Sequence, residues 1–328
     1  MNRKNSMRVL VAMVALSAFL LIAGCGSKAT TTSNTSSNNT PTSTEKTIKI
    51  GTLQTDDILP LWVAQSEGIA QKAGVNLDII TFQSAQEQIA AMTAGEIDGM
   101  MTDMVVPMQL TAGGTGVKAI TVMQGAPAGV VASKASGIKD VKGLANVKTG
   151  ISSPTVIEYI YDKALTEAGV PESQIKSEEI KKLPVRFEML NSGKIKAAGL
   201  PWTFYTMAVA QGATPVVDEA MASRYTSTVL EMSDTFLQED GAAATVKTLL
   251  DVWNQGVAEV NANPDSYREL LAEKANLPEP LKKTYKVRTY PEAGLPEQAQ
   301  VDDVAQWMVA KGYLKKAISY SEFVYSQN

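Results

Sequence analysis

Two stretches of ten residues share one pattern: residues 91–100 read AMTAGEIDGM and residues 189–198 read MLNSGKIKAA. Each is typical of the end of a helix, a glycine that closes it, and an apolar strand that follows. Gly95 and Gly193 take the same place in the two stretches, because glycine after a helix readily adopts the left-handed conformation. The pattern predicts two α/β units in the same order.

A second pair of segments supports this repeat. Residues 71–75 (QKAGV) recur as residues 166–170 (TEAGV), at nearly the same spacing as the first pair. Two α/β halves in one order imply two lobes. Chance similarity remains an alternative at this point, since helix, glycine and strand follow one another in many α/β proteins.

Strand-like and helix-like segments alternate through the first half of the chain. The expected strands are 47–53, 76–82, 97–102 and 117–123, and the expected helices are 60–73, 85–94 and 104–112. This alternation favours βαβ units and a largely parallel sheet. After residue 232 the pattern becomes helical, with helices expected at 242–261, after Pro264 and at 298–311. We expect these helices to pack on the first lobe and to make it discontinuous in sequence.

The composition excludes much of enzyme chemistry. The 328 residues contain no His and one Cys, so a Ser/His/Asp triad, a Cys/His pair, a disulfide and a His-based metal site are all excluded. We therefore expect no enzyme, no cofactor and no metal. The net charge of −4 argues against a nucleic-acid partner, which normally needs a basic surface.

The first residues are typical of a bacterial export signal. Arg3, Lys4 and Arg8 precede the apolar stretch 9–22, which is too short for a stable membrane span. Small residues then lead to Cys25, and this arrangement resembles the lipobox of bacterial lipoproteins, in which the signal is cut before the Cys. Residues 1–24 are thus predicted to be a lipoprotein signal peptide and Cys25 the lipidated residue; an ordinary secretory signal is the alternative.

Residues 25–46 follow as a polar segment rich in Ser, Thr and Asn. It has almost no apolar side chain to bury, so we expect a disordered tether between the lipid anchor and the folded part. The protein is then expected on the extracytoplasmic face of the cell membrane.

Several segments in order resemble one family. They are KIGTLQ (49–54), AGVNLDIITFQSA (73–85), AAMTAGEIDGMMTD (90–103), GIKDVKGLANVKTGISSPTVIEY (137–159) and RFEMLNSGKIKAAGLPW (186–202). Together they resemble the nitrate/sulfonate/taurine-type substrate-binding proteins of ABC importers, and are also similar to binding proteins for thiamine-pyrimidine precursors. Lys196 departs from the Asp that often follows Gly-x-Ile in that family.

The resemblance implies the type II periplasmic-binding-protein fold, two α/β lobes joined by two crossover strands, near 126–131 and 227–232. Lobe 1 is expected at 47–128 and 231–328, and lobe 2 at 129–230. The implied function is the capture of a small organic molecule, which is sulfonate/taurine-like or an amine-bearing heterocycle. The protein would then deliver this molecule to an ABC permease and its ATPase. We expect the protein itself to be a monomer. A ligand-sensing ectodomain and a pyrimidine-precursor synthase-like enzyme are the alternatives, the second needing a His and a Cys cluster that the chain lacks.

Ligands of parallel α/β lobes bind beyond the carboxyl ends of the strands, where loops lead into helices. Segments in that position supply the expected ligand-binding residues. In lobe 1 these are Gln54, Asp56, Asp57, Leu59, Ser84, Thr102 and Asp103, and in lobe 2 they are Ser152, Ser153, Thr155, Pro201 and Trp202. Trp202 could stack on a flat ligand, or be buried in its own lobe; the hydroxyls could equally cap helices.

The charges of these loops bear on the ligand. They carry Asp56, Asp57, Asp103 and nearby Glu158 but no Arg or Lys, which favours an amine-bearing or zwitterionic ligand over a bare oxyanion. The alternative is that these carboxylates only cap helices. Arg186 could meet an anion, although a surface ion pair is the favoured interpretation.

Overall fold

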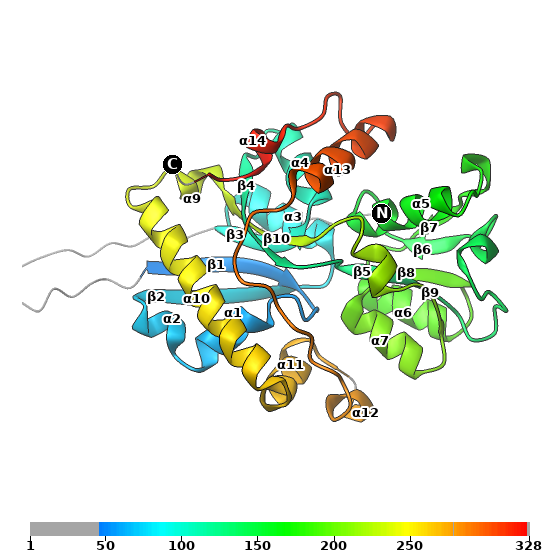
Figure 1. The fold of residues 1–328 in the computed structure, drawn as a ribbon, viewed down its shortest axis with the longest axis horizontal. Coiled ribbons are helices and arrows are strands. Elements are labelled where there is room, and N and C mark those ends of the chain that lie inside the picture. Colours follow the sequence, from blue (N-terminus) through cyan, green and yellow to red (C-terminus); the bar gives the residue numbers. More distant parts are fainter. Residues whose placement is uncertain (1–45, 278, 327–328) are drawn as a thin grey trace, which may run out of the picture. The chain divides into compact units, whose positions relative to one another are not determined.

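The computed structural model describes residues 46–277 and 279–326, and within them the chain forms two five-stranded sheets (Figure 1). The predicted signal peptide, Cys25 and residues 26–45 of the predicted tether lie outside the described residues, and Lys46, its last residue, begins β1. The first sheet contains β1 (Lys46–Leu53), β2 (Val75–Phe82), β3 (Gly99–Asp103), β4 (Val117–Gln124) and β10 (Thr228–Ser233), in the order β2-β1-β3-β10-β4. We call this sheet and its helices lobe 1.

The second sheet belongs to lobe 2. It contains β5 (Ala128–Ala132), β6 (Thr149–Ile151), β7 (Ser177–Glu179), β8 (Ala197–Pro201) and β9 (Thr214–Val217), in the order β7-β6-β8-β5-β9. Each sheet holds one strand that runs against its neighbours: β10 is antiparallel to β3 and β4, and β5 is antiparallel to β8 and β9. These are the strands that the chain enters directly after it passes from one lobe to the other.

The chain passes between the sheets twice. It leaves β4 and enters β5 through residues 125–127, and it returns from β9 to β10 through residues 218–227. The first strand of the second sheet after the first crossing starts at Ala128, and the strand that returns to the first sheet starts at Thr228. The expected type II fold, two α/β lobes with two crossings, is confirmed.

Helices cover both faces of the first sheet. The helices are α1 (Leu59–Ser66), α2 (Ile69–Lys72), α3 (Ala85–Ala94), α4 (Val105–Ala112) and α10 (Ala242–Ala262). Ile50 belongs to the core that includes Trp62 of α1, whereas the Cα hydrogen of its neighbour Gly51 faces Ile97 and Gln88 of the α3 side. Successive strand residues point to opposite faces, so α1 and α3 lie on opposite faces of β1.

The same alternation separates the helices of lobe 2, which are α5 (Val156–Glu167), α6 (Leu183–Asn191) and α7 (Trp202–Ala210), with the short α8 (Glu219–Ala222) after β9. Gly129 of β5 faces Trp202 and Tyr205 of α7, while Gly199 of β8 faces Ile157 of α5. Gly129 pairs with Leu200 and not with Gly199 in the ladder, so α5 and α7 cover opposite faces.

The C-terminal segment packs against elements of lobe 1. It contains α9 (Asp234–Leu237), α11 (Arg268–Lys274), α12 (Glu279–Lys282), α13 (Gln298–Ala310) and α14 (Tyr320–Phe323). Helix α10 packs along α1, and Val324 bridges to Ala119 of β4 (Figure 1). Trp253 of α10 is fully buried, and its indole N–H donates to the Pro291 carbonyl at 3.1 Å.

The repeated glycines behave as their sequence context predicts. Gly95 and Gly193 both have φ of 71°, and Gly74 and Gly169 have φ of 82° and 78°. These values lie in the left-handed region, which costs glycine least. The predicted helix 60–73 is interrupted at Gly68, also with positive φ, which separates α1 from α2.

One glycine carries a packing constraint that can be tested. A Cβ on Gly256 of α10 would lie 2.1 Å from the Pro60 carbonyl oxygen of α1. Gly256→Ala should therefore force the two helices apart and lower the free energy of unfolding by about 1–3 kcal/mol. Chemical denaturation monitored by circular dichroism would measure the change. The matched control is Ala258→Ser on the exposed side of α10, for which we expect a change within about 0.5 kcal/mol; equal stability of Gly256→Ala and the parent would contradict the packing argument.

Candidate functional site

A cavity of about 60 Å³ lies at the carboxyl ends of strands from both lobes. Its lining from lobe 1 is Leu53, Thr55, Asp57, Ala85, Met101, Thr102, Asp103 and Thr228; its lining from lobe 2 and the crossing is Pro127, Ala128, Ser152, Thr155, Val156, Ile157, Lys181, Leu183 and Pro201. A buried water molecule needs about 10–15 Å³ of cavity volume, so this cavity has room for only a few water-sized groups. Its contents must be small.

Asp57 is the most unusual side chain of this lining. It lies in the loop between β1 and α1, is 2% exposed, and its Oδ1 makes no hydrogen bond to any residue in the described part of the chain. Burial raises the pKa of Asp57 to about 7, the neighbouring Asp56 carboxylate adds to the rise, and Arg288 opposes it. A buried carboxyl oxygen without a partner is costly, and a bound donor would offset that cost.

Asp56, its neighbour, has a hydrogen-bond partner for one carboxyl oxygen, while its Oδ1 is buried without one among the described residues. Its Oδ2 accepts from the Tyr285 hydroxyl at 2.9 Å, its backbone carbonyl accepts from the Tyr290 hydroxyl at 2.7 Å, and Arg288 Nη1 lies 3.9 Å from its Oδ1. Arg288 also donates to Glu219 of lobe 2 at 2.5 Å. Asp56 thus connects the loop after β1 to the C-terminal segment next to the cavity. Arg288 connects lobe 1 to lobe 2.

Asp103 links two helix N-termini across the cavity. Its Oδ1 accepts from the backbone N–H groups of Val105 and Val106 of α4, at 2.7 and 3.1 Å. Its Oδ2 accepts from the N–H of Val156, the first residue of α5 in lobe 2, at 3.2 Å. Burial raises the pKa of Asp103, and these three N–H donors oppose the rise. One carboxylate therefore caps a helix of each lobe.

The predicted site residues divide into two groups. Those that line the cavity are Asp57, Thr102, Asp103, Ser152, Thr155 and Pro201; those that do not are Gln54, Asp56, Leu59, Ser84, Ser153 and Trp202. Among the second group, Leu59 is buried in the core, Ser84 caps α3 by accepting from Glu87 N–H, and Ser153 N–H donates to Glu179. Of the lining hydroxyls, Thr155 Oγ1 is engaged with the Ser152 carbonyl at 2.7 Å.

Trp202 is buried in its own lobe at the crossing. Its indole N–H donates to the Ala126 carbonyl of the first crossing, its ring packs edge-on against Tyr205 at 4.7 Å, and the Arg288 guanidinium lies 5.5 Å from the ring centre. Pro201, its neighbour, lines the cavity in its place. The expected stacking of Trp202 on a ligand finds no support in this position.

Sequence reasoning missed several residues around the cavity. Thr228 opens β10 after the second crossing, Lys181 stands at the margin, and Glu231 of β10 is fully buried with both carboxyl oxygens unpaired among the described residues. Burial, with the nearby Asp103 carboxylate, raises the pKa of Glu231 well above its usual value. Arg288 carried no sequence signal, since it lies in an irregular segment more than 200 residues from Asp56.

Arg186 does not form the surface ion pair that was favoured from the sequence. It is fully buried and donates to the Ile180 and Gly199 carbonyls, at 2.6–2.9 Å, where it connects α6 to the neighbouring strand ends. Burial lowers its pKa to about 10, against the opposing charge of Glu179. Its role is therefore structural.

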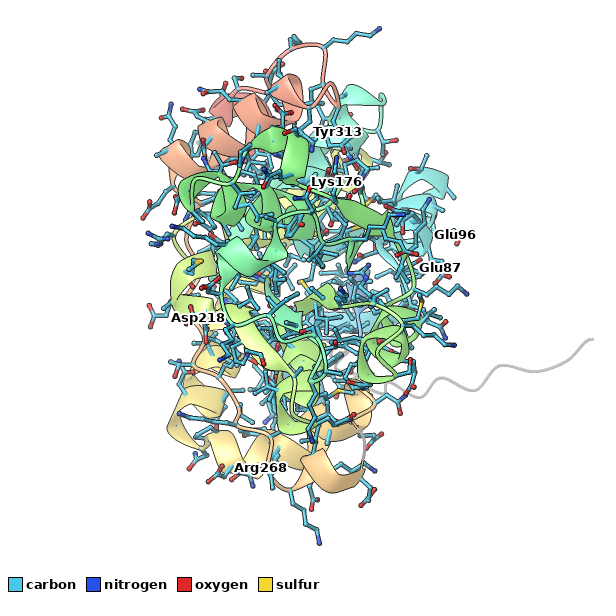
Figure 2. All side chains as sticks on the ribbon, turned by 90° about the vertical axis from the view of Figure 1, so that its right-hand side faces the viewer. Glu87, Glu96, Lys176, Asp218, Arg268 and Tyr313 are labelled. Atoms are coloured by element: carbon cyan, nitrogen blue, oxygen red, sulfur yellow. The ribbon has the colours of Figure 1, made fainter. Side chains whose placement is uncertain are left out.

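A second set of contacts joins the lobes away from the cavity, between α5 and the segment of α13. Lys311 Nζ lies 3.2 Å from Glu158 and 2.9 Å from Asp162, and the Trp307 indole donates to Asp162 at 3.1 Å. Tyr313, labelled in Figure 2, donates to Glu158 at 2.9 Å. Glu158, a predicted part of the acidic site environment, is thus engaged in closing the lobes on each other.

The described residues carry neither a metal-binding cluster nor a membrane-spanning helix. No group of three or more His, Cys, Asp or Glu side chains there is arranged to hold a metal ion. No helix among them is long and apolar enough to cross a membrane.

The raised pKa of Asp57 predicts a pH dependence. Between the unfolded value near 4 and the folded value near 7, the folded protein holds a proton that the unfolded chain lacks, so stability falls as pH rises through this window. Asp57→Asn removes this effect. The unfolding free energy of the variant, relative to the parent, should rise by about 2–3 kcal/mol from pH 5 to pH 8.

Denaturant titrations at several pH values would measure this difference. The control is Asp240→Asn, at an exposed carboxyl, which should leave the pH dependence of the parent unchanged. Parallel pH profiles of Asp57→Asn and the parent would contradict the assignment of a strained, buried carboxyl.

The sequence matches a known family model, and the fold is similar to those of several solved structures. The family model described as "NMT1/THI5 like" matches residues 55–267, while no curated protein sequence matches the chain. Among solved structures, the periplasmic aliphatic sulphonate binding protein SsuA from Escherichia coli superposes with a TM-score of 0.71 at 16% identity, covering 86% of this chain and 93% of that one.

Two further structures share the fold. The alkanesulfonate-binding protein SsuA from Xanthomonas axonopodis pv. citri, bound to MOPS, has a TM-score of 0.71 at 13% identity, covering 85% of this chain and 98% of that one. The periplasmic nitrate-binding protein NrtA from Synechocystis PCC 6803 has a TM-score of 0.65 at 14% identity, covering 84% of both chains. At such identities the structures show a common fold, and the family model, which spans more than half of the sequence, shows that this chain belongs to the NMT1/THI5-like family.

Proposed function

We propose that this protein is an extracytoplasmic solute-binding protein, which captures a small molecule between its two lobes and delivers it to an ABC permease. The observation that carries the proposal is the cavity itself: both lobes supply its lining, and it holds a buried carboxyl oxygen without a partner, on Asp57. Solute binding by the sulfonate- and nitrate-binding proteins of the same fold supports this reading.

A ligand captured between the two lobes can hold them in the closed arrangement. A ligand that contacts both lobes stabilises the closed arrangement, whereas one held by a single lobe would shift no equilibrium between open and closed forms. Here Asp57, Thr102 and Asp103 face Ser152 and Thr155 across the cavity. The short crossing 125–127 and the longer crossing 218–227 are where a hinge motion would be absorbed.

The ligand is a small organic molecule, either sulfonate/taurine-like or an amine-bearing heterocycle. The limited cavity volume, apolar lining such as Leu53 and Met101, and a few hydroxyl and carboxyl groups support a small polar solute. Catalysis is not proposed, since the sequence has no His and its single Cys stands at position 25, in the segment that resembles a lipobox.

Capture can be tested by filling the cavity. Ala85→Leu adds side-chain volume at the cavity wall, at the start of α3, and should abolish retention of the small molecule that remains on the purified protein in native mass spectrometry. The matched control is Ala94→Leu at the exposed end of the same helix, which should retain that molecule. Equal retention by both variants, with the parent's melting temperature preserved, would remove the cavity as the binding site.

The proposed location can be tested separately. Lipidation of Cys25 would anchor the protein to the membrane, because two or more acyl chains bind a bilayer durably whereas one binds only marginally. Cys25→Ser should leave radiolabelled palmitate unincorporated and release the chain from the membrane fraction, or block its processing. The control is Ser27→Ala, two residues beyond, which should keep the label. A parent chain that takes up no palmitate in a bacterial host would refute the anchor.

A further inference from the structure

We propose that the cavity selects a small organic cation, an ammonium or amidinium, and that Asp103 makes it reject oxyanions. This inference rests on the proposed function and specifies its ligand by charge. Asp57 is the residue that binds the cation, and Asp103 is the residue that excludes the anion.

A carboxylate of the protein already takes the position where an oxyanion would bind. The N-termini of α4 and α5 come from different lobes and point toward one carboxylate, and unpaired N–H groups at helix N-termini favour negative charge. Asp103 supplies that charge from within the protein: it accepts from Val105, Val106 and Val156 with its two oxygens. An incoming sulfonate or nitrate would have to displace a covalently held carboxylate that already uses these donors.

In the described part of the chain, the cavity lacks a hydrogen-bond donor for Oδ1 of Asp57. Asp57 is 2% exposed, lines the cavity, and has an Oδ1 without a partner among the described residues. The nearest positive charge is Arg288, which lies 3.9 Å from Asp56 Oδ1 and donates to Glu219 but gives no hydrogen bond to Asp57 Oδ1. A ligand N–H that carries positive charge would satisfy both the hydrogen bond and the charge of Asp57.

Among the side chains that line the cavity, carboxyl groups outnumber cationic groups. Asp57 and Asp103 are both carboxyls, and Lys181 is the one cationic side chain among the residues that line the cavity. Lys181 is exposed at the margin. Arg288 lies outside the lining, where its Nη2 donates to Glu219 at 2.5 Å and its Nε and Nη1 are buried without a hydrogen-bond partner among the described residues. An anion placed in the cavity would therefore meet more negative charge than positive, in a setting where burial strengthens repulsion.

The test uses probes small enough for the cavity. At pH 8, above the pKa near 7 of Asp57, ethylammonium and guanidinium chloride should bind the purified full chain, as measured by isothermal titration calorimetry at constant ionic strength. Tetramethylammonium chloride is the control cation, since it has no N–H to donate, and it should bind at least about tenfold more weakly. Sodium nitrate and sodium methanesulfonate should give no binding heat with the parent.

Two variants separate the roles. Asp57→Asn should weaken ethylammonium binding by about tenfold or more, because it removes a charge-assisted hydrogen bond. Asp103→Ala frees the three backbone N–H groups and should create measurable binding of nitrate or methanesulfonate. Circular dichroism melting would confirm that both variants are folded, and Asp240→Asn, on the surface, should behave as the parent with every probe.

The outcomes are decisive for the charge assignment and leave the capture test independent. Binding of methanesulfonate or nitrate by the parent, or ammonium binding no stronger than that of tetramethylammonium, would overturn the proposal. Asp103→Ala that folds but acquires no oxyanion binding would overturn the role of Asp103. If Ala85→Leu still abolished retention of the native solute in either case, solute capture would stand and only the charge of its ligand would change.

Discussion

The carboxylate of Asp103 is the interaction on which the geometry of the site depends. It accepts from the N-termini of α4 in lobe 1 and α5 in lobe 2, so it fixes the position of one lobe against the other at the edge of the cavity. A short side chain at the end of β3 can reach both helices because α4 begins directly after β3, and the start of α5, which follows β6 of the second sheet, lies at the same cavity. This contact brings the two lobes together at the edge of the cavity and places one carboxylate in its lining.

Stability and function oppose each other at Asp57. A buried carboxyl with an unpaired oxygen raises the energy of the folded protein. The neighbouring Asp56 accepts from the Tyr285 hydroxyl with one carboxyl oxygen and from the Tyr290 hydroxyl with its backbone carbonyl. Natural proteins retain such unfavourable groups mainly where a ligand uses them. Each of the two adjacent Asp residues keeps one buried oxygen without a hydrogen-bond partner among the described residues, and what distinguishes them is position: Asp57 lines the cavity and Asp56 does not.

The C-terminal helical segment does more than cover lobe 1. Through Arg288 it contacts Glu219 and Trp202 of lobe 2, and through Lys311 and Tyr313 it contacts Glu158 and Asp162 of α5. Lobe closure is thus held at the crossing, at the cavity and at a third position remote from it. Because the remote contacts involve partly exposed charges, salt should weaken them more than the buried contacts of Asp103.

The sequence by itself determined the elements and their order. Glycines such as Gly95 and Gly193, at helix ends, and the strand and helix periods act locally, and so they could be recognised without coordinates. The sequence also indicated that Asp57 and Asp103 stand at strand ends. Only the tertiary structure decided which of the candidates share a cavity, that Trp202 is directed to the crossing, and that Arg288 lies beside Asp56. These outcomes depend on contacts between residues far apart in the chain, and no local pattern records which distant side chain will satisfy a buried charge.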